Sequence, residues 1–327
     1  MSIESLIIDP RRLWRGDQIA DLPLAFVRLG DAAEWPDEPA MPPFPVVGLA
    51  EGSHPFARHL DCIIEPPIGA ETMARQVQAC PKAAATIVQL LRILPALDLD
   101  QGLTAESMAY GLLQGSAEHR EWLAVRSRAA VDAGQGQVPV AREGNKLTIT
   151  LDNPAHDNAI DRAMRDGLYQ ALELASLDPG IERVSLRATG RTFSLGAHLA
   201  EFGTTTDPAT AHEIRARTLP ARMALRCADK LDAHVQGGCV GSGLELAAYA
   251  RRFTAAPNAW FQLPELSMGI LPGAGGCVSL TRRIGRQRTA LMILSGKRIS
   301  ARCALAWGLV DATVDQPPGD EGGANLG

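Results

Sequence analysis

Apolar and polar positions in the first part of the chain predict a small sheet followed by helices. Short apolar runs of strand length, bounded by Gly, Pro or Asp, predict three strands, at 24–29, 45–50 and 62–64. The proline-rich stretch 36–45 between them predicts a loop. From 70 to about 128, apolar residues recur at helical spacing and predict two or three helices. We expect breaks between these helices near Pro81, Pro95 and Gly102.

The second part of the chain alternates strands with helices. A small polar stretch, 132–137, is typical of a linker, and after it a strand at 146–151, an amphipathic helix at 161–177 and a strand at 184–188 are expected. The order continues with helices at 209–227 and 243–250 and with strands at 231–235, 253–256 and 260–261. This order predicts an α/β fold. The expected division is an N-terminal domain, a larger second domain and a disordered tail: 1–135, 136–315 and 316–327.

Composition narrows the classes of protein that fit this pattern. The 327 residues are 46% hydrophobic, which allows a sizeable core, and the net charge of -5 argues against a nucleic-acid partner. No apolar stretch approaches the length of a membrane span, and the first residues do not resemble a secretion signal. The six cysteines form no Cys-x-x-Cys pair and have no His at metal-ligand spacing, so we expect reduced thiols and no metal site. A cytoplasmic protein without a membrane partner is the prediction.

Glycine-rich turns in the second part suggest phosphate binding, but none fits a nucleotide motif. The turn Gly241-Ser242-Gly243 lacks the third small residue of a dinucleotide fingerprint, and the glycines at 273–276 are not followed by the Lys of a P-loop. The same turn opens a helix with Glu245 in its first turn, and Glu265 follows a strand twenty residues later. Two carboxylates could therefore share a pocket. Taken singly, Glu245 also fits a helix-dipole role and Glu265 a solvated turn.

Ordered motifs carry a stronger signal than any of these residues alone. Residues 146–311 resemble the crotonase, or enoyl-CoA hydratase/isomerase, superfamily in five consecutive blocks: 151–160, LDNPAHDNAI; 193–199, FSLGAHL; 235–247, VQGGCVGSGLELA; 261–276, FQLPELSMGILPGAGG; and 299–311, ISARCALAWGLVD. The resemblance implies a β-β-α superhelix acting on coenzyme A thioesters. The N-terminal part is then a small α/β or mostly helical domain placed before this core.

The resemblance also implies roles for individual residues. Backbone N–H groups of Ala197 and Ser242 match the pair that holds the thioester oxygen, where preorganised donors stabilise an enolate. Glu245 and Glu265 match the acid/base pair of the hydratases, and Gly273 matches a glycine that helps to place the water. The expected substrate and coenzyme A contacts lie in the first two blocks: Asn158, Ala159, Leu195, Gly196, His198 and Leu199.

These matches predict a 2-enoyl-CoA hydratase that needs no cofactor beyond the coenzyme A of its substrate. Isomerase, hydrolase and cofactor-free dioxygenase reactions remain alternatives, as does a non-catalytic scaffold, because the fold does not fix the reaction. His156-Asp157 replaces a basic pair of the family's first block. The family adds covering and trimer-forming helices after the position of Asp311, so residues 70–128 are expected to take that place or to form an oligomer contact. A homo-oligomer is the expected state.

Overall fold

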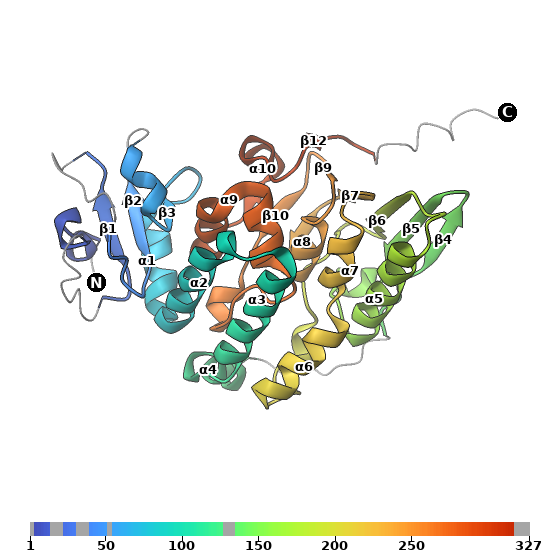
Figure 1. Ribbon diagram of the computed structural model, residues 1–327, viewed down its shortest axis with the longest axis horizontal. Coiled ribbons are helices and arrows are strands. Elements are labelled where there is room, and N and C mark those ends of the chain that lie inside the picture. The colour runs from blue at the N-terminus through green and yellow to red at the C-terminus, as the bar shows by residue number, and fades with distance from the viewer. Residues whose placement is uncertain (1–2, 14–21, 31–38, 51–53, 127–134, 317–327) are drawn as a thin grey trace.

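The computed structural model describes residues 3–13, 22–30, 39–50, 54–126 and 135–316. The N-terminal part begins with a parallel sheet in the order β1-β2-β3, formed by Ala25–Arg28, Val46–Leu49 and Cys62–Ile63. These strands confirm the three apolar runs. Short 3-10 turns flank them, at Glu4–Leu6, Pro10–Leu13 and Pro55–His59. In Figure 1 this sheet lies at the opposite end of the molecule from β4 and β5.

Helices follow the first sheet and pack onto the later part of the chain. They are α1 (Ala70–Ala79), α2 (Pro81–Ile93), α3 (Leu99–Gln114) and α4 (Ala117–Val125). Pro81 opens α2 and Pro95 lies in the 3-10 turn before α3, as expected. The predicted break at Gly102 is wrong, because Asp98 caps α3 through a capping box and the helix continues through the glycine. A Cβ at that position would contact Val278 of a later helix, so Gly102 serves close packing.

The larger sheet has the strand order β12-β9-β7-β6-β5-β4. Strands β5, β6, β7, β9 and β12 pair in parallel, and β4 is antiparallel to β5. Their bounds are Val140–Glu143 for β4, Lys146–Leu151 for β5, Arg183–Ala188 for β6, Leu231–Val235 for β7, Arg252–Ala255 for β9 and Ala312–Thr313 for β12. Alternate residues of β5 are buried, which is the period-two pattern that predicted the strand.

A further sheet, in the order β11-β10-β8, lies where the candidate motifs meet. It consists of Ile299–Ser300, Trp260–Gln262 and Gly238–Val240. Strand β8 was not expected from the sequence, because its three residues are too few for a periodic pattern. It pairs in parallel with β10 and leads directly into α8 (Ser242–Ala247). The sheet therefore connects the Glu245 helix to the segment that ends at Glu265.

The remaining helices surround the sheets. They are α5 (Arg162–Leu177), α6 (Pro208–Thr218), α7 (Pro220–Arg226), α9 (Gly276–Ser295) and α10 (Ala301–Trp307), with short 3-10 turns at Pro154–His156, Leu199–Glu201 and Glu265–Met268. The single helix expected at 209–227 is wrong, because Leu219 is extended and Pro220 starts a new helix. Residues 132–134 of the expected linker and 317–327 of the expected tail lie outside the described residues. The end of the expected linker is described, and its Gln137 forms an isolated bridge with Asp152.

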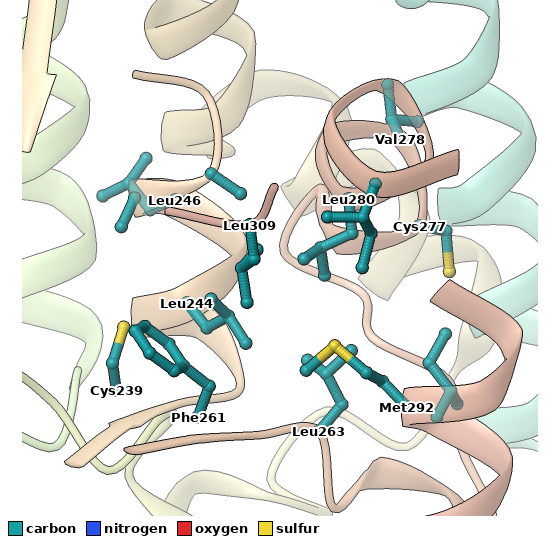
Figure 2. Close-up of a cluster of buried hydrophobic side chains, with 14 of the residues drawn as sticks. Cys239, Leu244, Leu246, Phe261, Leu263, Cys277, Val278, Leu280, Met292 and Leu309 are labelled. Carbon is teal, nitrogen blue, oxygen red and sulfur yellow. The ribbon is translucent and has the colours of Figure 1, made fainter. Parts of the chain in front are cut away.

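One buried apolar cluster extends from the N-terminal helices into the later part of the chain. It joins Ile87 and Leu91 of α2 to residues of α8, α9 and β10. Figure 2 shows part of it, with Leu244 of α8 and with Leu280 and Met292 of α9. A separate cluster lies under β1 and β2. The helical half 70–125 therefore packs directly on the rest of the chain, while the domain boundaries at 135 and 315 remain a prediction.

Candidate functional site

A cavity of about 640 Å³ lies where the candidate motifs meet, within the size range of small-molecule sites. Its walls come from the segments around Gly196, Gly241, Glu265 and Gly273, together with helices α3 and α6. Glu245, Glu265, Ala197, Ser242 and Gly273 all line it. The structure thus brings together the residues that the sequence placed far apart.

Glu245 is held at the N-terminus of α9 with its carboxyl group buried. The residue is 2% exposed, and its Oε2 accepts hydrogen bonds from the backbone N–H groups of Ala274 (2.7 Å) and Gly276 (2.9 Å). Burial raises its pKa to about 7, against the opposing effect of these two donors. A Cβ at Gly276 would collide with the Glu245 side chain, so glycine is required for this approach. Glu245 can therefore exchange a proton near neutral pH.

Glu265 enters the same cavity from the turn after β10. It is 8% exposed, and its Oε2 is buried without a hydrogen-bond partner among the described residues. Burial, followed by the charge of Glu245, raises the pKa of Glu265 well above the usual value of a glutamate. The neutral acid is therefore favoured at Glu265, and the ionised form is better supported at Glu245.

The loops that carry Ala197 and Ser242 run side by side. Ser194 N–H donates to Gly238 O (3.0 Å), and Val240 N–H donates to Ser194 O (2.9 Å), which holds the two segments in parallel. Gly241 has a φ of 48° and turns the chain into α8, so Ser242 itself is helical and needs no left-handed backbone. Ser242 N–H lies in the first turn of α8, which has no intrahelical acceptor for it.

A third buried carboxyl group, Glu106 of α3, lies beside Glu245. Its oxygens accept hydrogen bonds from the N–H groups of Gly275 (2.7 Å) and Val278 (3.3 Å). Burial, and then the charge of Glu245, raises the pKa of Glu106 well above its usual value. Glu106 and Glu245 therefore share the donors at the start of α9, which stabilise negative charge. Through these hydrogen bonds α3, a helix of the N-terminal part, packs beside Glu245.

The predicted substrate contacts fall into two groups. Leu195, Gly196, His198 and Leu199 line the cavity, and the two leucines are 41% and 48% exposed. Asn158 and Ala159 are not among its lining residues. Asn158 is fully buried, and its Nδ2 donates to the carbonyl oxygens of Thr189 and Thr192, both at 2.8 Å. Asn158 therefore fixes the loop below the cavity, and its role in binding stays a prediction.

Several lining residues come from elements that the sequence analysis did not connect with the site. Tyr110 and Gln114 belong to α3, His119 to α4 and Arg215 to α6. His119 Nδ1 lies 2.8 Å from Met268 O, and burial lowers its pKa. No signal for these contacts was present in the sequence, and it is the structure that shows Glu106 and Ser107 of α3 to be buried. Buried polar residues on a helix commonly mark such a contact.

Metal and membrane features are not found in the described residues. Within that part of the chain, no group of three or more His, Cys, Asp or Glu side chains is placed to hold a metal ion. None of the helices described is long and apolar enough to cross a membrane. The described cysteines are all free thiols, and burial raises the pKa of Cys239 and Cys277 near the cavity.

Comparison with known proteins identifies the class to which this fold and site belong. The enoyl-CoA hydratase/isomerase family model matches residues 142–318, more than half of the chain, and the chain belongs to this family. The expected crotonase-like α/β core is thereby confirmed. A solved structure of an enoyl-CoA hydratase/carnithine racemase from Magnetospirillum magneticum superimposes with a TM-score of 0.50 and 30% identity, covering 55% of this chain and 68% of that one.

Curated relatives are hydratases of different acyl-CoA substrates. The chain is 36% identical over 171 residues to the 2,3-dehydroadipyl-CoA hydratase of Escherichia coli, covering 52% of this chain and 66% of the relative. It is 32% identical over 169 residues to the mevalonyl-coenzyme A hydratase sidH of Aspergillus fumigatus, covering 52% and 63%. The matched part thus spans less than two thirds of each relative's length.

Proposed function

We propose that this protein is a hydro-lyase that adds water across the double bond of a 2-enoyl-CoA thioester. The observation that carries the proposal is the pair of buried glutamates, Glu245 and Glu265, in one cavity, where only the Glu245 carboxyl group of this pair accepts backbone N–H bonds from described residues, which favour its ionised form. Pairs of titratable groups whose environments separate their proton affinities commonly define a general acid and a general base. Membership of the hydratase/isomerase family and the names of the curated relatives support the same chemistry.

In the proposed reaction, the hydroxyl group of water bonds to the β-carbon and a proton bonds to the α-carbon. Glu245, ionised, takes a proton from water as the hydroxyl group bonds to the β-carbon. The electron pair of the double bond moves into the thioester as an enolate, and Glu265, protonated, delivers its proton to the α-carbon. A proton then returns from Glu245 to Glu265 through solvent. Backbone N–H groups of Ala197 and Ser242 would hold the enolate oxygen, where loss of one donor typically costs about 10²–10³ in rate.

The proposal also covers the binding of coenzyme A, the cellular location and the assembly of the protein. Coenzyme A enters as part of the substrate and no other cofactor is required. Its contacts are proposed at His198 and Leu199, which line the cavity, and at Arg162, a lining residue with a positive charge. We also propose a cytoplasmic location and assembly into a homo-oligomer.

The direct test is the absorbance of the enoyl-thioester band with purified full-length protein and a panel of aliphatic and aryl enoyl-CoA substrates. An oxygen electrode is read in parallel. Loss of the band without oxygen uptake is the expected result. Oxygen uptake would replace the proposal with dioxygenation, and coenzyme A binding without any turnover would favour a non-catalytic role.

The pH profile tests the assignment of the two glutamates. We expect kcat/KM to rise as pH increases through about 7, because Glu245 must be ionised and its pKa is raised to about 7. At higher pH we expect kcat/KM to fall again, because Glu265, whose pKa is also raised, loses the proton that it must deliver. Initial rates measured from about pH 5 to about pH 10 give the profile of the coupled pair. A single inflection at the pKa of an ordinary glutamate would contradict the assignment.

A further inference from the structure

Arg215 of α6 is a cation in the wall of the same cavity, and the proposed reaction does not use it. Its Nε donates to Ser107 Oγ (3.0 Å) and its Nη2 to Ser107 O (3.1 Å). A longer bond, 3.4 Å, joins Nη1 to Gln114 Oε1. A guanidinium group has five N–H donors, so these bonds leave donor capacity on both terminal nitrogens.

The partners of Arg215 are neutral. Among the described residues no carboxylate forms an ion pair with it, whereas its helix neighbour Arg217 pairs with Glu213. Burial lowers the pKa of Arg215, and the opposing effects of Tyr110 and Glu106 do not fully offset it. Since arginine stays charged in proteins, an anion beside it would offset this cost. A purely structural link between α3 and α6 could use neutral groups.

Tyr110 connects Arg215 to the reacting centre. The guanidinium carbon lies 4.4 Å from the centroid of the Tyr110 ring. The same ring packs on Gly273, where a Cβ would collide with it. The charges of Glu245 and Glu265 also reach Tyr110 and contribute to raising its pKa to about 12, behind the larger effect of burial. Tyr110 therefore contacts both Arg215 and the Gly273 loop, and Arg215 lines the same cavity as the two glutamates.

We propose that Arg215 binds a carboxylate at the far end of the acyl chain, so that the preferred substrates are 2-enoyl-CoA thioesters of dicarboxylic acids. Arginine suits this role because its planar donors match a carboxylate. This inference rests on the proposed hydratase function and adds the substrate class. A relative that is 36% identical is named as a hydratase of 2,3-dehydroadipyl-CoA, whose acyl group carries such a carboxylate.

The test compares two six-carbon substrates that differ at the end of the chain, 2,3-dehydroadipyl-CoA and 2-hexenoyl-CoA. We expect wild-type protein to prefer the charged substrate by about a hundredfold in kcat/KM, the order typical for a desolvated charge pair. In Arg215→Met the preference disappears, mainly through a higher KM for the charged substrate. Arg215→Lys restores part of it. Arg217→Met, an exposed position on the same helix, is the matched control and keeps the wild-type preference.

A structural role for Arg215 gives a different result. Arg215→Met would then lower the thermal melting temperature and slow both substrates equally, which would overturn the proposal. Equal kcat/KM values for the two substrates in wild-type protein would also overturn it.

A binding measurement on wild-type protein tests this inference separately from the hydratase function. It does not depend on whether any variant folds. Calorimetric titration with the saturated thioesters adipyl-CoA and hexanoyl-CoA is expected to show tighter binding of adipyl-CoA. If neither enoyl substrate reacts but adipyl-CoA binds more tightly, the hydratase proposal fails and the carboxylate site stands. If hexenoyl-CoA is hydrated but the two saturated thioesters bind equally, the carboxylate site fails and the hydratase proposal stands.

Discussion

Replacing Glu245 with Gln is expected to lower kcat/KM for enoyl-CoA hydration by about 10²–10⁴, the range typical of a general acid or base. The amide keeps the size of the side chain but cannot take a proton from water. Glu265→Gln is expected to fall in the same range because it removes the proton delivered to the α-carbon. Because the two groups act on one transition state, the double variant should be little worse than either single variant.

The controls for these variants separate catalysis from folding. Glu71→Gln changes an exposed glutamate on α1 and should leave the rate at the wild-type value. Melting temperatures should not fall for Glu245→Gln, because burial disfavours the charge that it removes, or for Glu265→Gln, because it replaces a neutral acid with a neutral amide. Wild-type rates in both glutamine variants would show that the acid/base assignment is wrong.

Replacing Asp61 with Ala is expected to destabilise the protein by about 3–5 kcal/mol, the usual cost of removing one member of a buried charge pair. Asp61 is 1% exposed and its Oδ2 accepts from Arg92 Nη2 (2.7 Å) and from Val46 N–H (2.8 Å). Arg286 of α9 lies 3.6 Å from its other oxygen. The substitution therefore leaves two largely buried arginines without their shared carboxylate, at the junction between the first sheet and α9.

Urea denaturation followed by circular dichroism measures this loss. Asp232→Ala, which removes the more exposed ion pair with Arg251, is the matched control and should change the free energy of unfolding by about 1 kcal/mol or less. If Asp61→Ala and Asp232→Ala were equally stable, the ion pairs of Asp61 with Arg92 and Arg286 would not hold the N-terminal sheet to the rest of the chain.

The strands and the site loops could be predicted because their signals are local. Alternation in β5 and the run before Glu265 depend on neighbouring residues, and the motif order placed Glu245 and Glu265 in one cavity. The short strand β8 and the break at Pro220 were missed, because three residues show no period and a proline can either kink or restart a helix.

The contribution of the N-terminal helices could not be predicted, because it depends on contacts between residues far apart in the sequence. Glu106 meets the N–H group of Gly275, and Tyr110 meets Gly273, across about half of the chain. The apolar spacing in α3 did not mark its buried face, because Met108 and Leu112 are exposed while Glu106 is buried. The motif also did not show that the Asn158 side chain is buried and bonded to the carbonyl oxygens of Thr189 and Thr192.

The addition of water itself is the central claim, and the mass of the product tests it most directly. Wild-type protein is incubated with a 2-enoyl-CoA thioester in water enriched with heavy oxygen, and the product is analysed by mass spectrometry. We predict that the product is heavier than the substrate by one molecule of labelled water, with the label in a hydroxyl group on the β-carbon. A product of unchanged mass, or one whose added oxygen is unlabelled, would contradict the claim.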